Sequence, residues 1–340
     1  MTIPATFNAF RIHSDDAGYR SGIERVSIDD LSPGEIVVRV AHSSVNFKDA
    51  LAGTGEGKIL RRFPLVGGID LAGHVAASSD PKFREGDAVL VTGCGLSESR
   101  DGGYSEYARI EAKWAIPLPA GLSLRESMIL GTAGFTAALA LLRMQENRQS
   151  PGLGPLAVTG ATGGVGSLAV DIFSSAGYAL HAISGKPEHA DYLKAIGASE
   201  VLGRDALATA RAMESVKFGG GLDNVGGPML ASLLAQTRPY GNVASAGLAA
   251  SADLPTTVMP FIIRGVSLLG VASAGTARDI RDEVWRRLAS DWKPRHLERI
   301  CTREATLAEL PDVFAAMLAG GSLGRTLVTL RDGGPFAKTA

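Results

Sequence analysis

Cysteine is scarce in this sequence of 340 residues. Cys94 and Cys301 are its two cysteines, and they stand far apart with no metal-ligand spacing around them. Neither a disulfide framework nor a cysteine-rich metal site can therefore organise the fold. So few cysteines fit a reducing compartment, and we expect a cytoplasmic protein.

An excess of charge of one sign and long apolar runs are also missing. The net charge is −1, which gives no field that favours nucleic acid or an anionic membrane. No uncharged apolar run reaches the 18 or more residues that typically span a bilayer. Residues 1–7 lack the basic start and the apolar stretch of a signal peptide. We therefore expect a small-molecule substrate, with neither nucleic acid nor a membrane as a partner.

Apolar residues and glycine are what the sequence has in quantity. The chain is longer than one hydrophobic core usually supports, so we expect two domains. Apolar residues make up 45% of it, an ordinary share for filling two cores. The 42 glycines come in short clusters inside apolar sequence, as in an enzyme with tight turns and close backbone approaches to a ligand.

The first part of the chain, to about residue 125, is predicted to be mainly β. Residues 35–40 and 87–92 have the branched side chains of strands, and glycine and proline punctuate the region at short intervals. This pattern is typical of a small barrel of short strands. From Ser123 the pattern changes to helix, most clearly over residues 133–144.

Between about residues 155 and 271, strands and helices are predicted to alternate, which indicates βαβ units and a parallel sheet. The expected strands are residues 156–159, 178–183, 200–202, 221–225, 241–246 and 266–271, with helices after the first of them and over residues 190–196. The last segment is predicted to hold helices at 278–288 and 307–318 and a strand at 325–330.

A glycine-rich turn follows the strand at 156–159. Gly160, Gly163 and Gly166 are spaced as in a dinucleotide-binding fingerprint, between a predicted strand and a predicted helix. Glycine allows the sharp turn, the approach of backbone N–H groups to a pyrophosphate, and close packing of helix on strand. The helix N-terminus adds unpaired donors and a positive dipole end. The alternative is a glycine-rich turn in an unrelated α/β protein.

The next strand indicates which nucleotide is bound. An NAD site usually presents an acid there for the ribose hydroxyls, whereas this strand ends in Ser184, Gly185 and Lys186, with no acid before Glu188. A hydroxyl and a cation suit a 2′-phosphate, and Arg204 could add a second cation. We therefore predict NADP(H) as the cofactor. The alternative is that Lys186 and Arg204 are solvated surface residues.

The sequence resembles the zinc-free branch of the medium-chain dehydrogenase/reductase superfamily, especially the acrylyl-CoA reductase and quinone-oxidoreductase-like group. The resemblance covers nearly the whole chain. Its motifs are the glycine turn and residues 44–51 (SVNFKDAL), 68–73 (GIDLAG), 131–137 (GTAGFTA), 223–227 (DNVGG) and 260–266 (PFIIRGV).

The resemblance implies an α/β fold of two domains. A GroES-like β-barrel catalytic domain would comprise residues 1–127 and 274–340, and a Rossmann NADP-binding domain with a doubly wound parallel sheet would comprise residues 128–273. The cofactor would lie in the cleft between them. Members usually dimerise through the Rossmann sheet, and residues 266–273 occupy the strand that would form the interface of a homodimer.

The resemblance also implies which residues bind the cofactor. Those expected at the pyrophosphate and the nicotinamide are Phe47, Thr132, Thr162, Gly163, Gly164, Val165, Leu248, Ile262 and Ser273; those at the adenosine phosphate are Ser184, Gly185, Lys186 and Arg204. Ser322 and Arg325 lie where the family closes over the cofactor. Leu248 and Ile262 are equally plausible as plain core residues.

The residues that bind zinc in metal-dependent relatives are missing from this chain. The position of an early cysteine ligand falls within residues 46–49 (NFKD), and the Gly-His-Glu motif is replaced by residues 68–70 (GID). The structural zinc lobe is reduced to Cys94 alone. We therefore expect no metal, and alcohol oxidation through a zinc Lewis acid is not expected either.

Reduction of an activated carbon–carbon double bond suits such a site. Hydride arrives at the carbon β to a carbonyl, and donors must stabilise the resulting enolate while a proton reaches the α carbon. Asn46, Lys48 and Asp49 are the catalytic candidates, with Asp70 behind them. In the alternative, Asp49 caps the helix beginning near Ala50 and Lys48 pairs with it.

One departure from the family motif concerns that proton. Related sequences commonly have tyrosine where this chain has Phe47, which keeps a ring for packing on the nicotinamide but loses a hydroxyl. Solvent or another residue would then provide the proton.

The leading hypothesis is therefore an NADPH-dependent reductase of a short 2-enoyl-CoA, such as acrylyl-CoA to propionyl-CoA. Lys58, Arg61 and Arg62 could meet the phosphates of a CoA thioester, although such a run is often a solvated loop. The alternatives are a quinone or enone oxidoreductase and an NADPH-binding protein without catalysis, which the loss of the tyrosine favours.

Overall fold

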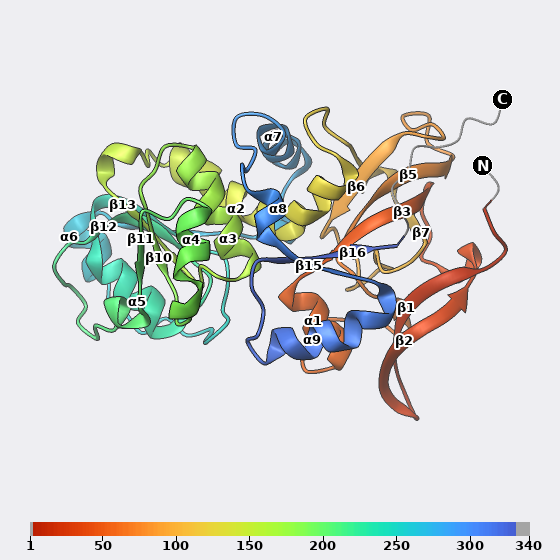
Figure 1. The fold of residues 1–340 in the computed structure, drawn as a ribbon, viewed down its shortest axis with the longest axis horizontal. Coiled ribbons are helices and arrows are strands. Elements are labelled where there is room, and N and C mark those ends of the chain that lie inside the picture. The colour runs from red at the N-terminus through yellow and green to blue at the C-terminus, as the bar shows by residue number, and fades with distance from the viewer. Residues whose placement is uncertain (1–2, 331–340) are drawn as a thin grey trace. The chain divides into compact units, whose positions relative to one another are not determined.

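The computed structural model describes residues 3–330, whose chain folds into two compact units (Figure 1). The first unit is Met1–Thr132 with Cys301–Ala340, and the second is Ala133–Ile300. The predicted domain boundary at residue 274 thus differs from the unit boundary after residue 300. The reason is packing, because the buried Trp285 stacks on Phe135 within the second unit, with ring centroids 6.2 Å apart.

The first unit holds two sheets. A three-stranded sheet has the order β2-β1-β4, and a larger one has the order β15-β16-β3-β5-β6-β8, with β7 also paired to β3. The strands are β1 (Phe7–Asp15), β2 (Gly18–Val26), β3 (Ile36–Val45), β4 (Leu65–Val66), β5 (Asp70–Ser78), β6 (Ala88–Thr92), β7 (Tyr107–Ile110), β8 (Ile116–Pro117), β15 (Cys301–Ala305) and β16 (Arg325–Thr329). The predicted strands at 35–40, 87–92 and 325–330 are confirmed by β3, β6 and β16.

Strand β3 organises this unit. Its alternating side chains enter two different cores, with Val37 and Val45 in one and Val38 and Val40 in the other. The strand pairs with β5, β7 and β16, so a segment from the end of the chain completes a sheet begun near its start. Helix α1 (Phe47–Thr54) follows β3 directly and contacts helix α9 (Leu310–Leu318).

The second unit is a six-stranded parallel sheet in the order β11-β10-β9-β12-β13-β14. Numbered by position along the chain, this is the order 3-2-1-4-5-6 of a Rossmann fold. The strands are β9 (Leu156–Thr159), β10 (Leu180–Ile183), β11 (Glu200–Leu202), β12 (Phe218–Asp223), β13 (Thr237–Ser245) and β14 (Ser267–Gly270). The predicted parallel sheet is therefore confirmed.

The helices of the second unit follow the predicted alternation. They are α3 (Gly164–Ser175), α4 (Ala190–Ala195), α5 (Gly227–Gln236), α6 (Met259–Arg264), α7 (Arg278–Leu288) and α8 (Leu297–Ile300). Helix α7 has the bounds predicted from the sequence. The sequence did not predict α6, whose six residues are too few to show a helical period.

Helix α2 (Leu124–Glu146) is long and apolar enough to cross a membrane, but 89% of its apolar window is buried in the protein. Burial of this kind is typical of a core helix. The helix is also interrupted, because Gly131 has φ 50° and ψ −155°.

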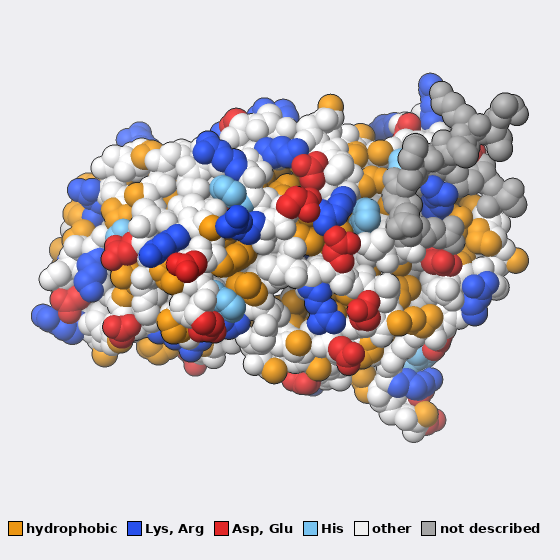
Figure 2. Space-filling view, in the orientation of Figure 1, with side chains coloured by type: hydrophobic (Ala, Val, Ile, Leu, Met, Phe, Trp, Pro, Cys, Tyr) orange, Lys and Arg blue, Asp and Glu red, His pale blue; other side chains and the backbone are white. Residues whose placement is uncertain are grey.

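The surface carries charges of both signs. Figure 2 shows Lys and Arg side chains interspersed with Asp and Glu on the face in view, with no broad area of one sign. This mixture is consistent with the net charge of −1.

Candidate functional site

The glycine turn lies at the carboxyl end of β9, where a Rossmann fold binds its ligand. Gly160 has φ 59°, the left-handed conformation that a sharp turn needs. A Cβ on Gly166 would lie 2.3 Å from the carbonyl oxygen of Gly160, so only glycine lets α3 approach the turn. Gly163 is the residue before the first turn of α3, and Thr162, Gly164 and Val165 surround the helix start. This arrangement leaves backbone donors for a pyrophosphate.

The predicted adenosine-phosphate residues come together after β10 and β11. The Ser184 hydroxyl accepts a hydrogen bond from the backbone N–H of Lys186 at 3.0 Å. Arg204 is exposed, and its guanidinium lies against Gly185, where a Cβ would be 2.4 Å from its Nε. A hydroxyl and a cation thus flank one backbone turn, as a bound phosphate requires.

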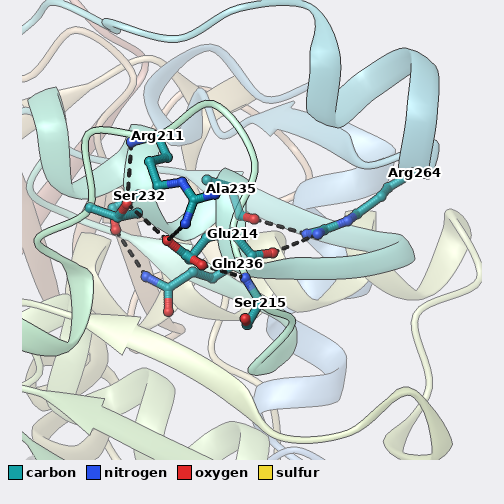
Figure 3. A network of polar contacts seen from close by, with 8 residues as sticks. Arg211, Glu214, Ser215, Ser232, Ala235, Gln236 and Arg264 are labelled. Atoms are coloured by element: carbon teal, nitrogen blue, oxygen red, sulfur yellow. Dashed lines mark hydrogen bonds and ion pairs between the residues drawn. The ribbon is translucent and has the colours of Figure 1, made fainter.

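The loop that carries Arg204 is fastened at several points (Figure 3). Gln236 Nε2 donates to the carbonyl oxygen of Ala206 at 3.1 Å, and Arg264 donates to the carbonyl oxygens of Glu214, Ala235 and Thr237. Arg264 therefore ties α6 and the end of α5 to the loop. This anchoring limits where Arg204 can lie.

The carboxyl ends of β9 and β12 are joined by side chains that the sequence reasoning missed. The Thr159 hydroxyl donates to Asp223 at 2.8 Å and accepts from the backbone N–H of Asn224 at 2.9 Å. The Asn224 amide donates to the Thr159 carbonyl oxygen at 2.8 Å. Asp223 is fully buried, and burial raises its pKa. These bonds fix the point where the strand order reverses, which is the ligand-binding crevice of such sheets.

The residues predicted for the nicotinamide end are exposed. Leu248 is 67% exposed and Ile262 is 73% exposed, so the alternative that they are core residues is wrong. Leu248 lines a pocket beside the ends of β13 and β14, together with Ser245, Gly247 and Val271. Ser273 is partly buried, and its carbonyl oxygen accepts a hydrogen bond from the buried Arg281 at 2.9 Å.

Asp70 is the centre of a buried polar cluster in the first unit. Its carboxylate accepts hydrogen bonds from Ser44 Oγ at 2.7 Å, Asn46 Nδ2 at 2.8 Å, and both the backbone N–H and the hydroxyl of Thr132 at 2.9 and 2.6 Å. Asp70 is fully buried, so each of these donors is held where it is. The sequence placed Asp70 behind the site without this role.

Asn46 is saturated by internal partners. Its amide donates to Asp70 and to Asp49 Oδ2 at 2.8 and 3.1 Å, and its Oδ1 accepts from Arg325 Nη1 at 3.2 Å. An amide nitrogen has two protons, and both are used here. The prediction that Asn46 donates to a substrate carbonyl would thus require one of these bonds to break.

Asp49 is buried at the start of α1. Its two oxygens accept from the backbone N–H groups of Asn46 at 2.8 Å and Ile69 at 2.9 Å. Burial, reinforced by the charge of Asp70, raises the pKa of Asp49 to about 7. The carboxyl group closes the first turn of α1, as the capping alternative expected.

Arg325 supplies the positive charge of the cluster. It is 3% exposed, and it donates to the carbonyl oxygens of Ile129 and Val45, each at 2.9 Å. Burial lowers its pKa, and Asp70 and Asp49 oppose this shift. Arg325 therefore lies within the cluster, while Ser322 is partly buried in the turn before β16.

Lys48 and Phe47 point away from the buried cluster. Phe47 is 48% exposed. Lys48 Nζ lies 3.0 Å from Glu98 Oε2, so the alternative in which Lys48 pairs with Asp49 is wrong.

The predicted phosphate-binding residues are partly engaged already. Arg61 lies 2.7 Å from Glu98, and Arg62 lies 3.6 Å from the buried Asp101. Lys58 is exposed. Two of the three cations therefore have acidic partners within the protein.

Across residues 3–330, no group of three or more His, Cys, Asp or Glu side chains could hold a metal ion.

Two families match the chain. Residues 32–120 match the alcohol dehydrogenase GroES-like domain, and residues 164–290 match the zinc-binding dehydrogenase family.

Curated relatives cover nearly the whole chain. The acrylyl-CoA reductase AcuI of Ruegeria pomeroyi is 43% identical, over 95% of this chain and 98% of its own length. A Bacillus subtilis protein with the provisional name quinone oxidoreductase YhfP is 46% identical, over 91% of this chain and 94% of its own length.

Solved structures share the fold. The yhdH oxidoreductase of Salmonella enterica, crystallised with NADP, is 43% identical with a TM-score of 0.92, over 95% of this chain and 100% of the other. Bacillus subtilis yhfP, crystallised with NAD, is 44% identical with a TM-score of 0.93, over 96% of this chain and 100% of the other.

Proposed function

Because this chain belongs to the medium-chain dehydrogenase/reductase superfamily, in the group of the acrylyl-CoA reductases and related quinone oxidoreductases, we propose that it is an NADPH-dependent reductase of activated carbon–carbon double bonds. Its substrate is a short 2-enoyl-CoA such as acrylyl-CoA, which becomes propionyl-CoA. The relative named acrylyl-CoA reductase, similar along almost its entire length, is the main support for this substrate.

The choice of NADPH rests on the turn after β10. The Ser184 hydroxyl and the Arg204 guanidinium flank Gly185, and no acidic side chain ends this strand. Binding of NADP by the Salmonella relative favours the same choice, while the Bacillus relative holds NAD. The residues of this chain fit a 2′-phosphate better than a pair of ribose hydroxyls.

When bound, the nicotinamide supplies a hydride to the carbon β to the thioester carbonyl. The protein must bear the negative charge that moves to the carbonyl oxygen. Of the three predicted catalytic residues, Lys48 is the one with an exposed charge, and Asn46 and Asp49 act as positioning residues that hold the first turn of α1. Solvent supplies the proton to the α carbon, because Phe47 has no hydroxyl.

The cofactor assignment is tested with Arg204→Gln. Arg204 is one of the two cations beside the phosphate turn, so its loss should lower kcat/KM for NADPH about tenfold or more and leave that for NADH within about twofold. The matched control is Arg211→Gln, in the same loop but paired with Glu214. Equal losses with both nucleotides would contradict the assignment.

The substrate is tested by NADPH consumption with acrylyl-CoA and with a soluble quinone in parallel. We expect kcat/KM to be higher for the thioester. The name of the Bacillus relative favours a quinone as the second candidate, and turnover of quinone without thioester would establish it. NADPH binding without turnover of any enone would instead indicate a protein that binds the cofactor without catalysis.

We also propose a cytoplasmic homodimer. Strand β14 is the last strand of its sheet and has a free edge within the described chain, residues 3–330, which can pair with a second copy.

A further inference from the structure

Glu98 occupies a fixed place between two cations of the first unit. Its Oε2 lies 3.0 Å from Lys48 Nζ, and its Oε1 lies 2.7 Å from Arg61 Nη2. Lys48 belongs to α1, directly after the buried cluster, whereas Arg61 belongs to the basic segment, which we define as residues 58–62. One carboxylate therefore links the candidate active-site helix to the segment predicted to meet phosphate.

The backbone around Glu98 holds it in this place. Ser97 has φ 56°, and the backbone N–H of Glu98 donates to the carbonyl oxygen of Gly95 at 3.2 Å, so residues 95–98 form a tight turn. The Arg61 N–H donates to the carbonyl oxygen of Glu98 at 2.7 Å, and Arg62 Nε donates to that of Ser99 at 3.0 Å. The basic segment is thereby docked along the turn, and the Glu98 side chain, 21% exposed, has little freedom to leave its cations.

The charge of Glu98 opposes an anionic substrate. A phosphate that approaches Arg61 meets a guanidinium already paired with a carboxylate, and it is repelled by that carboxylate. The two ion pairs, together with nearby Lys48, hold the pKa of Glu98 below its usual value, although burial acts in the other direction. An uncharged enone has no phosphates and is not subject to this repulsion.

From this arrangement we infer that Glu98 is a specificity-determining residue, which sets the preference between phosphate-bearing thioesters and uncharged enones. The inference rests on the proposed function, because it takes CoA phosphates to approach the basic segment. Glu98 reduces the attraction of Lys48 and Arg61 for these phosphates and leaves neutral substrates unaffected.

The test is the variant Glu98→Gln, which keeps the size of the side chain and removes its charge. At low ionic strength the KM for acrylyl-CoA should fall about fivefold, since one like charge a few ångströms away is removed. The KM for methyl vinyl ketone should stay within about twofold. The fall in the thioester KM should shrink in about 0.5 M salt, which a purely structural change would not produce.

Two further variants separate charge from shape and from net charge. Glu98→Asp shortens the side chain but keeps its charge, so it should retain the wild-type KM for the thioester. Glu56→Gln removes an exposed charge in the loop after α1, and its carboxylate forms no ion pair within residues 3–330. A fall in KM with Glu56→Gln equal to that with Glu98→Gln, or an unchanged ratio of the two KM values in Glu98→Gln, would overturn the inference.

A last measurement distinguishes failure of the inference from failure of the proposed function. If the wild-type enzyme does not reduce acrylyl-CoA, CoA itself is used as an inhibitor of methyl vinyl ketone reduction. Its inhibition constant should fall about fivefold in Glu98→Gln. The absence of inhibition by CoA in both proteins would overturn the inference, whereas turnover of acrylyl-CoA with an unchanged KM ratio would overturn it and leave the proposed function standing.

Discussion

At the scale of single residues, the first unit is organised around two buried carboxyl groups and one buried guanidinium. Asp70 holds Asn46 and Thr132, Asp49 holds the first turn of α1, and Arg325 donates to the strand and helix ends around them. Burying such charges is costly unless each finds partners, and here nearly every polar atom has one. The cluster therefore fixes the residues that precede Phe47 and Lys48.

Asp49 makes stability depend on pH. Its pKa in the folded protein is about 7, against a usual value of 3.8, so the folded state binds a proton that the unfolded state lacks between these pH values. The contribution to stability is complete below about pH 3.8 and is lost as the pH rises to about 7. Relative to Asp49→Asn, the wild-type free energy of unfolding should fall by about 1 kcal/mol per pH unit from pH 5 to 7.

Urea denaturation at several pH values measures this difference. The exposed Asp29→Asn is the control, and its difference from wild type should stay flat. A wild-type advantage over Asp49→Asn that grows with pH would contradict the assigned direction of the shift.

Gly131 has no room for a side chain. Its φ is 50°, and a Cβ there would lie 2.6 Å from both Asp70 Oδ2 and Ser44 Oγ. Gly131→Ala should therefore lower the free energy of unfolding by about 2 to 4 kcal/mol, through backbone strain and overpacking. Gly22→Ala is the matched control, because nothing lies within 4 Å of its Cβ position. Equal urea midpoints for the two variants would argue against this packing.

At the scale of elements, the glycine turn depends on the distance between β9 and α3. Gly166→Ala would place a methyl group 2.3 Å from the Gly160 carbonyl oxygen and push the start of α3 away from the turn. We expect the Kd for NADPH, measured by calorimetry, to rise about tenfold or more. Gly152→Ala, whose Cβ would have Ser150 Oγ at 3.9 Å as its nearest neighbour, should leave the Kd unchanged.

The same elements explain how far the sequence alone could predict the structure. Strands β9 and β11 and helix α7 have the predicted bounds, because the signals for them are local. The cluster around Asp70 joins Ser44 and Thr132 across 26 and 62 positions, and Lys48 finds Glu98 across 50. Contacts at such separations depend on strand register and loop course, which no local pattern encodes.

At the scale of the whole molecule, we expect light scattering to give about twice the chain mass of 35.3 kDa, as for a dimer that pairs β14 strands. Ile263 in α6, directly before β14, is 59% exposed. Ile263→Asp should shift the mass toward that of one chain, because a charge there would be buried by the partner. Ile23→Asp, at a 46% exposed position in β2, is the control. A single-chain mass for the wild-type protein would refute the dimer.

The pairing of β16 with β3 has a consequence for synthesis on the ribosome. Thr326 lies opposite Val45, so a strand made early must wait for one made almost last. Until Arg325 has emerged, the nascent chain carries two acidic groups in a forming core without their cation. Domains generally fold as their sequence emerges, but here the second unit can assemble while the first is still incomplete. The nascent first unit should therefore be the part most open to proteases and most in need of a chaperone.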